Sequence, residues 1–186
     1  MCHFVTAVLP REAPVSELDA IARRHHRRLQ PQANPSIEAE LRPGERYFLT
    51  TSGHCDCGTP LGALARGRMK KPLDCEGEAK RLRALGWGET KISRWLAQKA
   101  QAAERNAFVR HAEGTLAMDE WLQFLTDVLG SKLTPYIGIL LHWYDGPLTG
   151  RLQLQGREVV GLSDVTVDTL ARLKEDVIYE FRSLGP

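Results

Sequence analysis

The chain has 186 residues, of which 42% are hydrophobic and 26% are charged, and its formal net charge is +2. These values are typical of a single water-soluble domain, here residues 1–186, with a sizeable core. The sequence also excludes a protein that crosses a bilayer with α-helices. The longest apolar run, 137–143, is far shorter than the roughly 18–20 residues such a helix requires.

The N-terminal segment predicts a buried strand. Residues 2–9 are rich in valine, threonine and phenylalanine, and Pro10 ends the pattern. The segment is short and lacks a basic leader, so a strand is favoured over a signal peptide. We therefore expect a cytoplasmic protein, whose cysteines serve as free thiols or metal ligands rather than as disulfides.

A helix and a β-hairpin are expected next. The helix ends at Pro31, and a period-2 pattern followed by the turn Pro43-Gly44 predicts a hairpin over residues 36–51. Because the helix returns the chain to the level where the first strand began, the second hairpin strand would run antiparallel to residues 2–9. This arrangement would bring the stretch after residue 51 close to Cys2.

Helices dominate the middle of the chain. Residues 59–73 have the glycine and proline content that is typical of a loop. Helical periodicity then predicts a helical segment over about 76–130. Gly114 is expected to divide its longer part into two helices.

The last third returns to strands and ends in a helix. Residues 136–144 are strongly apolar and predict a central strand, with residues 151–155 pairing to it as a hairpin and a short strand over 158–160. A final helix is expected from about residue 166 through Phe181. The whole pattern predicts an α+β fold: a mainly antiparallel sheet with helices packed on it and a long helical insertion in the middle.

Charge is unevenly spread along the chain. Residues 66–110 carry 12 basic and 5 acidic side chains, a net charge of +7, whereas residues 111–186 carry 6 basic and 11 acidic ones, a net charge of −5. Either the two regions neutralise each other across the surface, or the basic segment forms a docking face. The side chains expected to bind a partner at such a face are Arg66, Arg68, Lys70, Lys71 and Trp87.

The densest group of metal-binding side chains lies in the stretch Gly53-His54-Cys55-Asp56-Cys57-Gly58. Thiolates and imidazoles at tetrahedral spacing are the ligands of zinc. The expected metal ligands are Cys2, His54, Cys55 and Cys57, and zinc is the expected ion. Two alternatives remain open, in which the cysteines are inert buried thiols or reactive ones.

Signatures of enzymes and nucleic-acid-binding proteins are weak. Removal of Met1 would expose Cys2 as an N-terminal nucleophile whose own amine could act as its base. A cysteine paired with His54, His3 or His142 is a second arrangement for thiol catalysis, but no family signature surrounds these residues. Trp87 and Trp95 interleave with the basic side chains, yet a sequence pI of about 8.4 is low for a nucleic-acid-binding domain. Nucleotide-binding glycine loops and the zinc-protease motif are absent from the sequence.

Three stretches, residues 1–6, 46–51 and 53–59, resemble a group of small bacterial proteins to which no activity is attached. The resemblance therefore implies no catalytic residues. Small α+β cytoplasmic bacterial proteins without catalytic motifs often neutralise a toxin. We expect an immunity or inhibitor-type protein that binds a cognate toxin through its surface, with a structural cysteine site. The alternative is a thiol- or zinc-dependent enzyme centred on Cys55 and Cys57.

Overall fold

The structure is a computed structural model that describes residues 2–69 and 74–183, without the side chains of 64, 66–69 and 103–117. Its described part is mixed α+β, as the sequence predicts, and contains one sheet of strand order β2-β3-β1-β4-β6-β5. Neighbouring strands run antiparallel except β5 and β6, which are parallel. The strands are β1 (Cys2–Pro10), β2 (Gln30–Pro31), β3 (Glu45–Leu49), β4 (Tyr136–Tyr144), β5 (Gly156–Gly161) and β6 (Val177–Arg182).

The described helices lie in the connections between these strands, and one helix is far longer than the rest. The helices are α1 (Val15–Arg24), α2 (Pro35–Glu38), α3 (Pro60–Met69), α4 (Cys75–Ala84), α5 (Glu89–Gly130) and α6 (Val167–Ala171), with a 3-10 turn η1 (Leu162–Asp164). Among the helices that the structure describes, none has the length and apolarity needed to span a bilayer.

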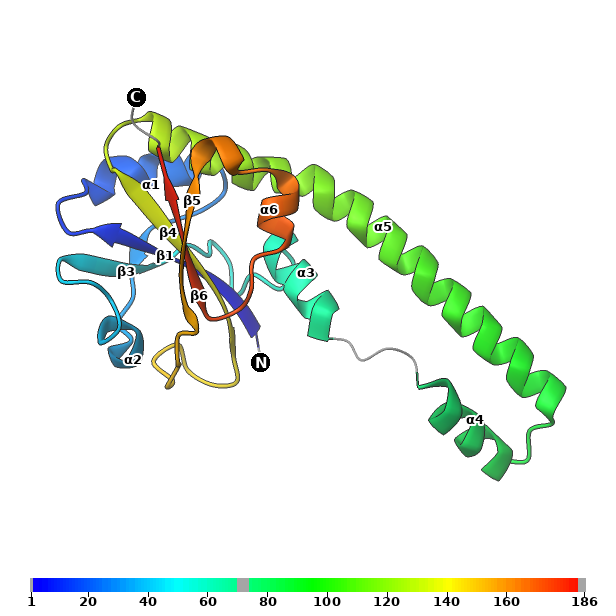
Figure 1. Ribbon diagram of the computed structural model, residues 1–186. Coiled ribbons are helices and arrows are strands. Elements are labelled where there is room, and N and C mark those ends of the chain that lie inside the picture. The colour runs from blue at the N-terminus through cyan, green and yellow to red at the C-terminus, as the bar shows by residue number, and fades with distance from the viewer. Residues whose placement is uncertain (1, 70–73, 184–186) are drawn as a thin grey trace.

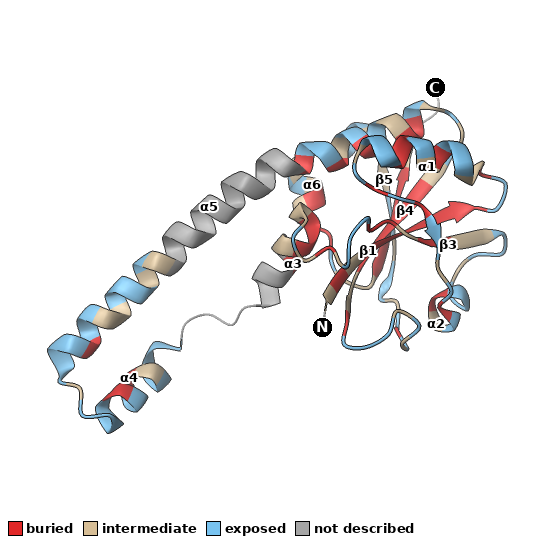
Figure 2. Cartoon of the chain, turned by 180° about the vertical axis from the view of Figure 1, so that it is seen from behind, coloured by how far each residue is buried: buried red, intermediate tan, exposed pale blue. Residues whose placement is uncertain are grey.

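One face of the sheet is covered by α1, α6 and the C-terminal part of α5 (Figure 1). Val5, Ala7 and Leu9, which alternate along β1, are fully buried on this face, as the period of a strand requires. They share one hydrophobic cluster with Leu18 of α1 and Phe124 of α5. Figure 2 shows the buried positions gathered between the sheet and this helical layer, which is the main core of the protein.

The N-terminal part of α5 leaves the sheet and carries α4 at its far end (Figure 1). A helix of 42 residues is about 63 Å long at 1.5 Å per residue, which exceeds the span of the sheet. The two helices share a small cluster of their own, formed by Ala79, Leu82 and Ile92. We call α4, the following turn and residues 89–102 of α5 the arm.

The predicted hairpin over residues 36–51 is wrong in its first strand. Residues 35–38 form α2, because the side chain of Asn34 accepts hydrogen bonds from the backbone N–H groups of Ser36 and Ile37 and Pro35 follows it. The strand that pairs with β3 is the short β2 instead. The expected orientation of β3 is nevertheless correct, since it runs antiparallel to β1.

Other predicted elements are wrong where glycine is expected to end a helix or where an apolar pattern fits both a helix and a strand. Residues 60–69 form α3 rather than a loop, and α5 continues through Gly114, since one glycine costs only about 1 kcal/mol in a long helix. Residues 151–155 are not a strand. The expected C-terminal helix stops at Ala171, and Val177–Arg182 forms β6, in which β-branched and aromatic residues suit a buried strand.

A network of charged side chains lies on the face of the sheet opposite the helical layer. Arg157 of β5 donates hydrogen bonds to Glu45 at 2.6 and 2.8 Å and to Glu180 at 2.7 Å. Arg42 and Arg182 also bind Glu180, which is completely buried. Burial by itself would raise the pKa of Glu45 and Glu180, but the hydrogen bonds from the arginines outweigh it and hold both pKa values below their ordinary value.

We expect acid to destabilise the fold through this network. A carboxylate whose pKa is lowered by folding contributes stability above its ordinary pKa of 4.5, and that contribution is lost as the pH falls through the lowered folded value. Glu180→Gln should cost about 1.5–3 kcal/mol at pH 7, because it removes the buried carboxylate that accepts charge-assisted hydrogen bonds from Arg157, Arg42 and Arg182. The stability of this variant should also fall less steeply between about pH 5 and pH 3, the range in which carboxylates of this kind become protonated.

Urea unfolding at several pH values measures both effects. Glu12→Gln is the matched control, because Glu12 is exposed. An acid profile of Glu180→Gln as steep as that of the unchanged protein would contradict the assignment of the acid sensitivity to this network.

Candidate metal centre

The loop after β3 is fastened to the first residues of β1. Thr50 donates to the carbonyl oxygen of Val5 from both its backbone N–H, at 3.2 Å, and its hydroxyl, at 2.6 Å. The Asp56 N–H donates to the carbonyl oxygen of His3 at 2.8 Å. The loop therefore extends the pairing of β3 with β1 beyond the end of the strand, and it brings Cys55 and Cys57 to the N-terminus of β1.

Asp56 is the anchor of this loop. Its side chain is completely buried and accepts hydrogen bonds from the Val5 N–H at 2.8 Å, from Arg27 Nη1 at 2.6 Å and from the Thr51 hydroxyl. A buried carboxylate is tolerated only when charge-assisted hydrogen bonds replace its hydration, and these donors do so. Because Asp56 points into the protein, its neighbours Cys55 and Cys57 are held at the surface of the loop, where both are half-buried.

Three cysteines meet at this point. The sulfur atoms of Cys2, Cys55 and Cys57 all lie within 4.8 Å of one another, and all three residues are half-buried free thiols. Thiolates bound to one zinc ion at about 2.3 Å in a tetrahedron are about 3.8 Å apart, so small side-chain rotations would complete such a site. The three cysteines are therefore close enough to bind a metal ion.

The donor set also suits a cation. The backbone N–H of His3 donates to the sulfur of Cys57 at 3.2 Å, which holds that sulfur beside β1. Partial exposure leaves a path for an ion to enter. Soft thiolate ligands select zinc or copper(I) among the common metals.

Other candidate ligands are placed differently. His54 is exposed and does not belong to the group of three sulfurs, so the structure brings together three of the four expected ligands. Cys75 is exposed at the first position of α4. His3 is buried, and its Nε2 bonds Glu175 at 2.9 Å. Its Nδ1 has no hydrogen-bond partner among the described residues. His142 bonds Asp176.

Gly62 in α3 lets this helix pack closely against the cysteine loop. A Cβ atom at this position would lie 2.0 Å from the carbonyl oxygen of Asp56, so only glycine allows the helix to approach the loop this closely. The same carbonyl oxygen accepts a hydrogen bond from the Thr59 hydroxyl at 2.9 Å. Gly62 therefore serves close packing, which explains why its presence did not mark a loop.

The expected partner-binding side chains fall in two different parts of the molecule. Trp87 lies in the turn between α4 and α5, half-buried, with the ammonium group of Lys91 3.9 Å from its ring centroid. Arg66 and Arg68 belong to α3, a helix that contacts β1, whereas the turn lies at the far end of α5 (Figure 1). Their side chains, and the whole of Lys70 and Lys71, lie outside the described residues.

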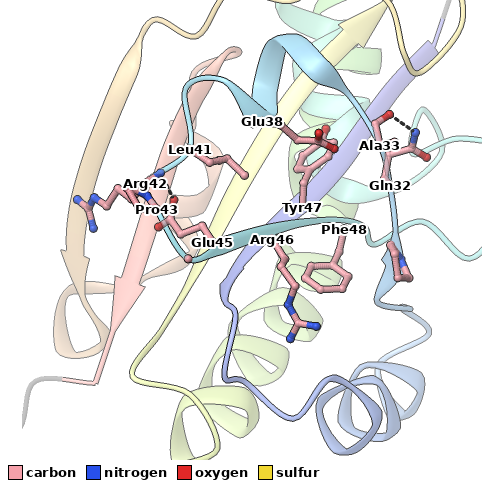
Figure 3. Close-up of a pocket in the computed structure, with 12 residues that line it drawn as sticks. Gln32, Ala33, Glu38, Leu41, Arg42, Pro43, Glu45, Arg46, Tyr47 and Phe48 are labelled. Carbon is pink, nitrogen blue, oxygen red and sulfur yellow. Dashed lines mark hydrogen bonds between the residues drawn. The ribbon is translucent and has the colours of Figure 1, made fainter.

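A cleft of about 720 Å³ lies at the outer edge of β3 (Figure 3). Tyr47 and Phe48 line it from the strand, and Glu38 and Leu41 from α2 and the chain that follows it. None of the cysteines lines this cleft, so the cleft and the cysteine site are separate features of the molecule.

Comparison with known proteins adds no family. No protein-family model matches the chain. Neither a curated protein nor a solved structure matches it. The chemistry of the site therefore carries the functional argument.

We expect Gly62→Ala to destabilise the protein and loosen the cysteine loop. The added methyl group has no space beside the Asp56 carbonyl, and forced overpacking of this kind typically costs about 1–3 kcal/mol. Gly58→Ala is the matched control in the same loop, since a Cβ there meets nothing within 4 Å. Thermal unfolding and the rate of thiol alkylation test this. Equal behaviour of the two variants would show that the close approach of α3 is unimportant.

Proposed function

We propose that the protein binds one zinc ion through Cys2, Cys55 and Cys57, and that the ion fastens the N-terminus of β1 to the loop after β3. The proximity of the three sulfur atoms, all within 4.8 Å, is the observation that carries this proposal. The proposal also implies a cytoplasmic protein, since a reducing compartment keeps these thiols available as ligands.

The fourth ligand distinguishes a structural site from a catalytic one. Structural zinc sites have four protein ligands, whereas catalytic sites keep one position for water or substrate. His54 sits beside Cys55 on the exposed loop and could supply the fourth ligand after a local adjustment. If it does, the site is structural. If water takes that position, the same three thiolates would support a zinc-dependent enzyme centred on Cys55 and Cys57.

Anaerobically purified protein should bind one zinc ion per chain, measured by elemental analysis and by competition with a chelator. Cys57→Ser should weaken binding at least about 100-fold, because it removes a thiolate ligand. Zinc at about 100 times its dissociation constant should stabilise the fold by about 2.7 kcal/mol. His54→Ala should weaken binding if the site is closed and leave it unchanged if water is the fourth ligand.

Cys75→Ser is the matched control, since Cys75 lies on α4 outside the group of three. It should bind zinc like the unchanged protein. Zinc binding that survives Cys57→Ser, or that is absent from the unchanged protein, would refute the proposal and leave only inert or reactive thiols.

A second candidate function is the neutralisation of a partner toxin by surface binding. The arm supports it, because it projects from the sheet (Figure 1) and carries Leu85, Trp87 and Lys91 at its far end. Leu85 is 64% exposed, and Trp87 is half-buried under Lys91. Exposed apolar and aromatic side chains with positive charge are the usual composition of an interface centre.

Co-expression with a toxin encoded beside the gene should restore growth if this candidate is correct. Trp87→Ala should weaken the complex by about 2 kcal/mol or more, roughly 30-fold, if Trp87 is an anchor. Arg151→Ala, an exposed change on the sheet domain, should leave binding unchanged. Full protection by Trp87→Ala would remove the arm as the binding surface.

A further inference from the structure

The strand β5 forms one edge of the sheet, and its described strand neighbour is β6 alone. Edge strands carry unpaired backbone N–H and C=O groups, and natural edges are usually protected by proline, lysine or a covering segment. The sequence of β5, Gly-Arg-Glu-Val-Val-Gly, contains neither proline nor lysine. Val159 in its centre is 58% exposed. Among the residues that the structure describes, Leu85 on the arm and Val159 are the large hydrophobic side chains classed as exposed.

The hydrogen-bond pattern identifies which backbone groups point outward from β5. Thr50 donates to Val5 and Arg11 donates to Gly44, so odd-numbered residues of β1 direct their backbone groups toward β3. Strands alternate, so even-numbered residues of β1 face β4. The uninterrupted registers carry this alternation through β4 and β6.

This alternation directs the backbone groups of the even-numbered β6 residues toward β5. In a parallel pair, each such residue bonds the two β5 residues on either side of its register partner, so Ile178, paired with Arg157, bonds Gly156 and Glu158. The even-numbered residues of β5 therefore bond β6. The backbone groups of Arg157, Val159 and Gly161 point away from the sheet. The exposed valine thus coincides with a free donor and a free acceptor at the middle of the edge.

Val159 is an exposed apolar side chain whose charged neighbours are already paired with opposite charges. Val159 is the register partner of Glu180, so both side chains lie on the same face of the sheet. The charges next to it are already matched, because Arg157 is hydrogen-bonded to Glu45 and Glu180. Glu158 lies on the opposite face and pairs with Lys174 at 3.6 Å.

We propose that β5 pairs antiparallel with β5 of a second copy of this chain, with Val159 opposite Val159 of the second copy. In this two-fold register Arg157 stands opposite Gly161 of the second copy, and both pairs use outward-pointing backbone groups. Glu158 stands opposite Val160 of the second copy. A shift of one residue toward the N-terminus would instead place Glu158 opposite its own copy, and like charges directly opposite are destabilising.

The charge pattern therefore favours one self-complementary register, and that register buries the exposed valines against each other. The two sheets would join into one continuous sheet. The contact uses neither the cysteines nor the arm, so it is independent of metal binding and of a toxin partner.

Light scattering after size-exclusion chromatography tests the mass. The unchanged protein should run at about twice the chain mass of 20.8 kDa. Val159→Lys should run as a single chain, because it places two ammonium groups opposite each other. Leu85→Lys is the matched control, since it changes the other exposed hydrophobic side chain, and it should keep the mass of the pair.

Amide hydrogen exchange gives a second and independent signature. In the pair, the N–H groups of Arg157 and Val159 should be protected together with those of Glu158 and Val160. In Val159→Lys the first two should exchange quickly while the other two, bonded to β6, stay protected, which also shows that the sheet is intact.

A single-chain mass for the unchanged protein at about 100 μM, a concentration far above the Kd of any stable dimer, would overturn the proposal. So would a pair that survives Val159→Lys, or one that Leu85→Lys dissociates.

Discussion

The carboxylate of Asp56 is the interaction on which the candidate metal centre depends. It is buried without any contact to solvent, and its donors come from β1, from the segment after α1 and from its own loop. Arg27, one of these donors, stacks on Trp121 of α5 at 4.2 Å. A single buried charge thus joins the sheet, the loop and the helical layer. Since a buried charge is costly without its partners, the loop has little freedom to move the cysteines apart.

The charge network on the other face has a different consequence, which concerns the shape of the sheet. Glu45 of β3 and Arg157 of β5 bond at 2.6 Å, although β1, β4 and β6 lie between their strands. In a flat sheet four steps between strands would separate them by about 19 Å, more than two side chains can bridge. The sheet must therefore coil strongly, with β3 and β5 approaching each other over this face. Buried ion pairs contribute little net stability but specify such an arrangement.

The sequence predicted the class of fold and the meeting of Cys2 with Cys55 and Cys57, because both follow from strand direction. The direction of β3 was correct even though its partner was not, since Asn34 and Pro35 start a helical turn where alternation favoured a strand. Strand and helix periods overlap over so short a segment. The same ambiguity hid β6, whose apolar residues fit both periods.

Long-range partners could not be read from the sequence at all. Nothing in its local pattern connects Asp56 with Arg27 or His3 with Glu175, because such pairs depend on how distant segments pack. Asp56 did stand between two cysteines in the most ligand-rich stretch of the chain. Its position next to both ligands was therefore visible, but its burial and its role in orienting them were not.

The cysteine site also joins parts of the chain that are remote in sequence, and this sets the order in which the protein can fold. The arm consists of consecutive helices, whose local contacts form quickly. The bond from His3 to Cys57 spans 54 residues, and that from His3 to Glu175 spans 172. Closing such loops costs entropy before any contact compensates for it, so β1 acquires its surroundings late. A chain still emerging from the ribosome would contain all three cysteines long before the residues that enclose His3 exist.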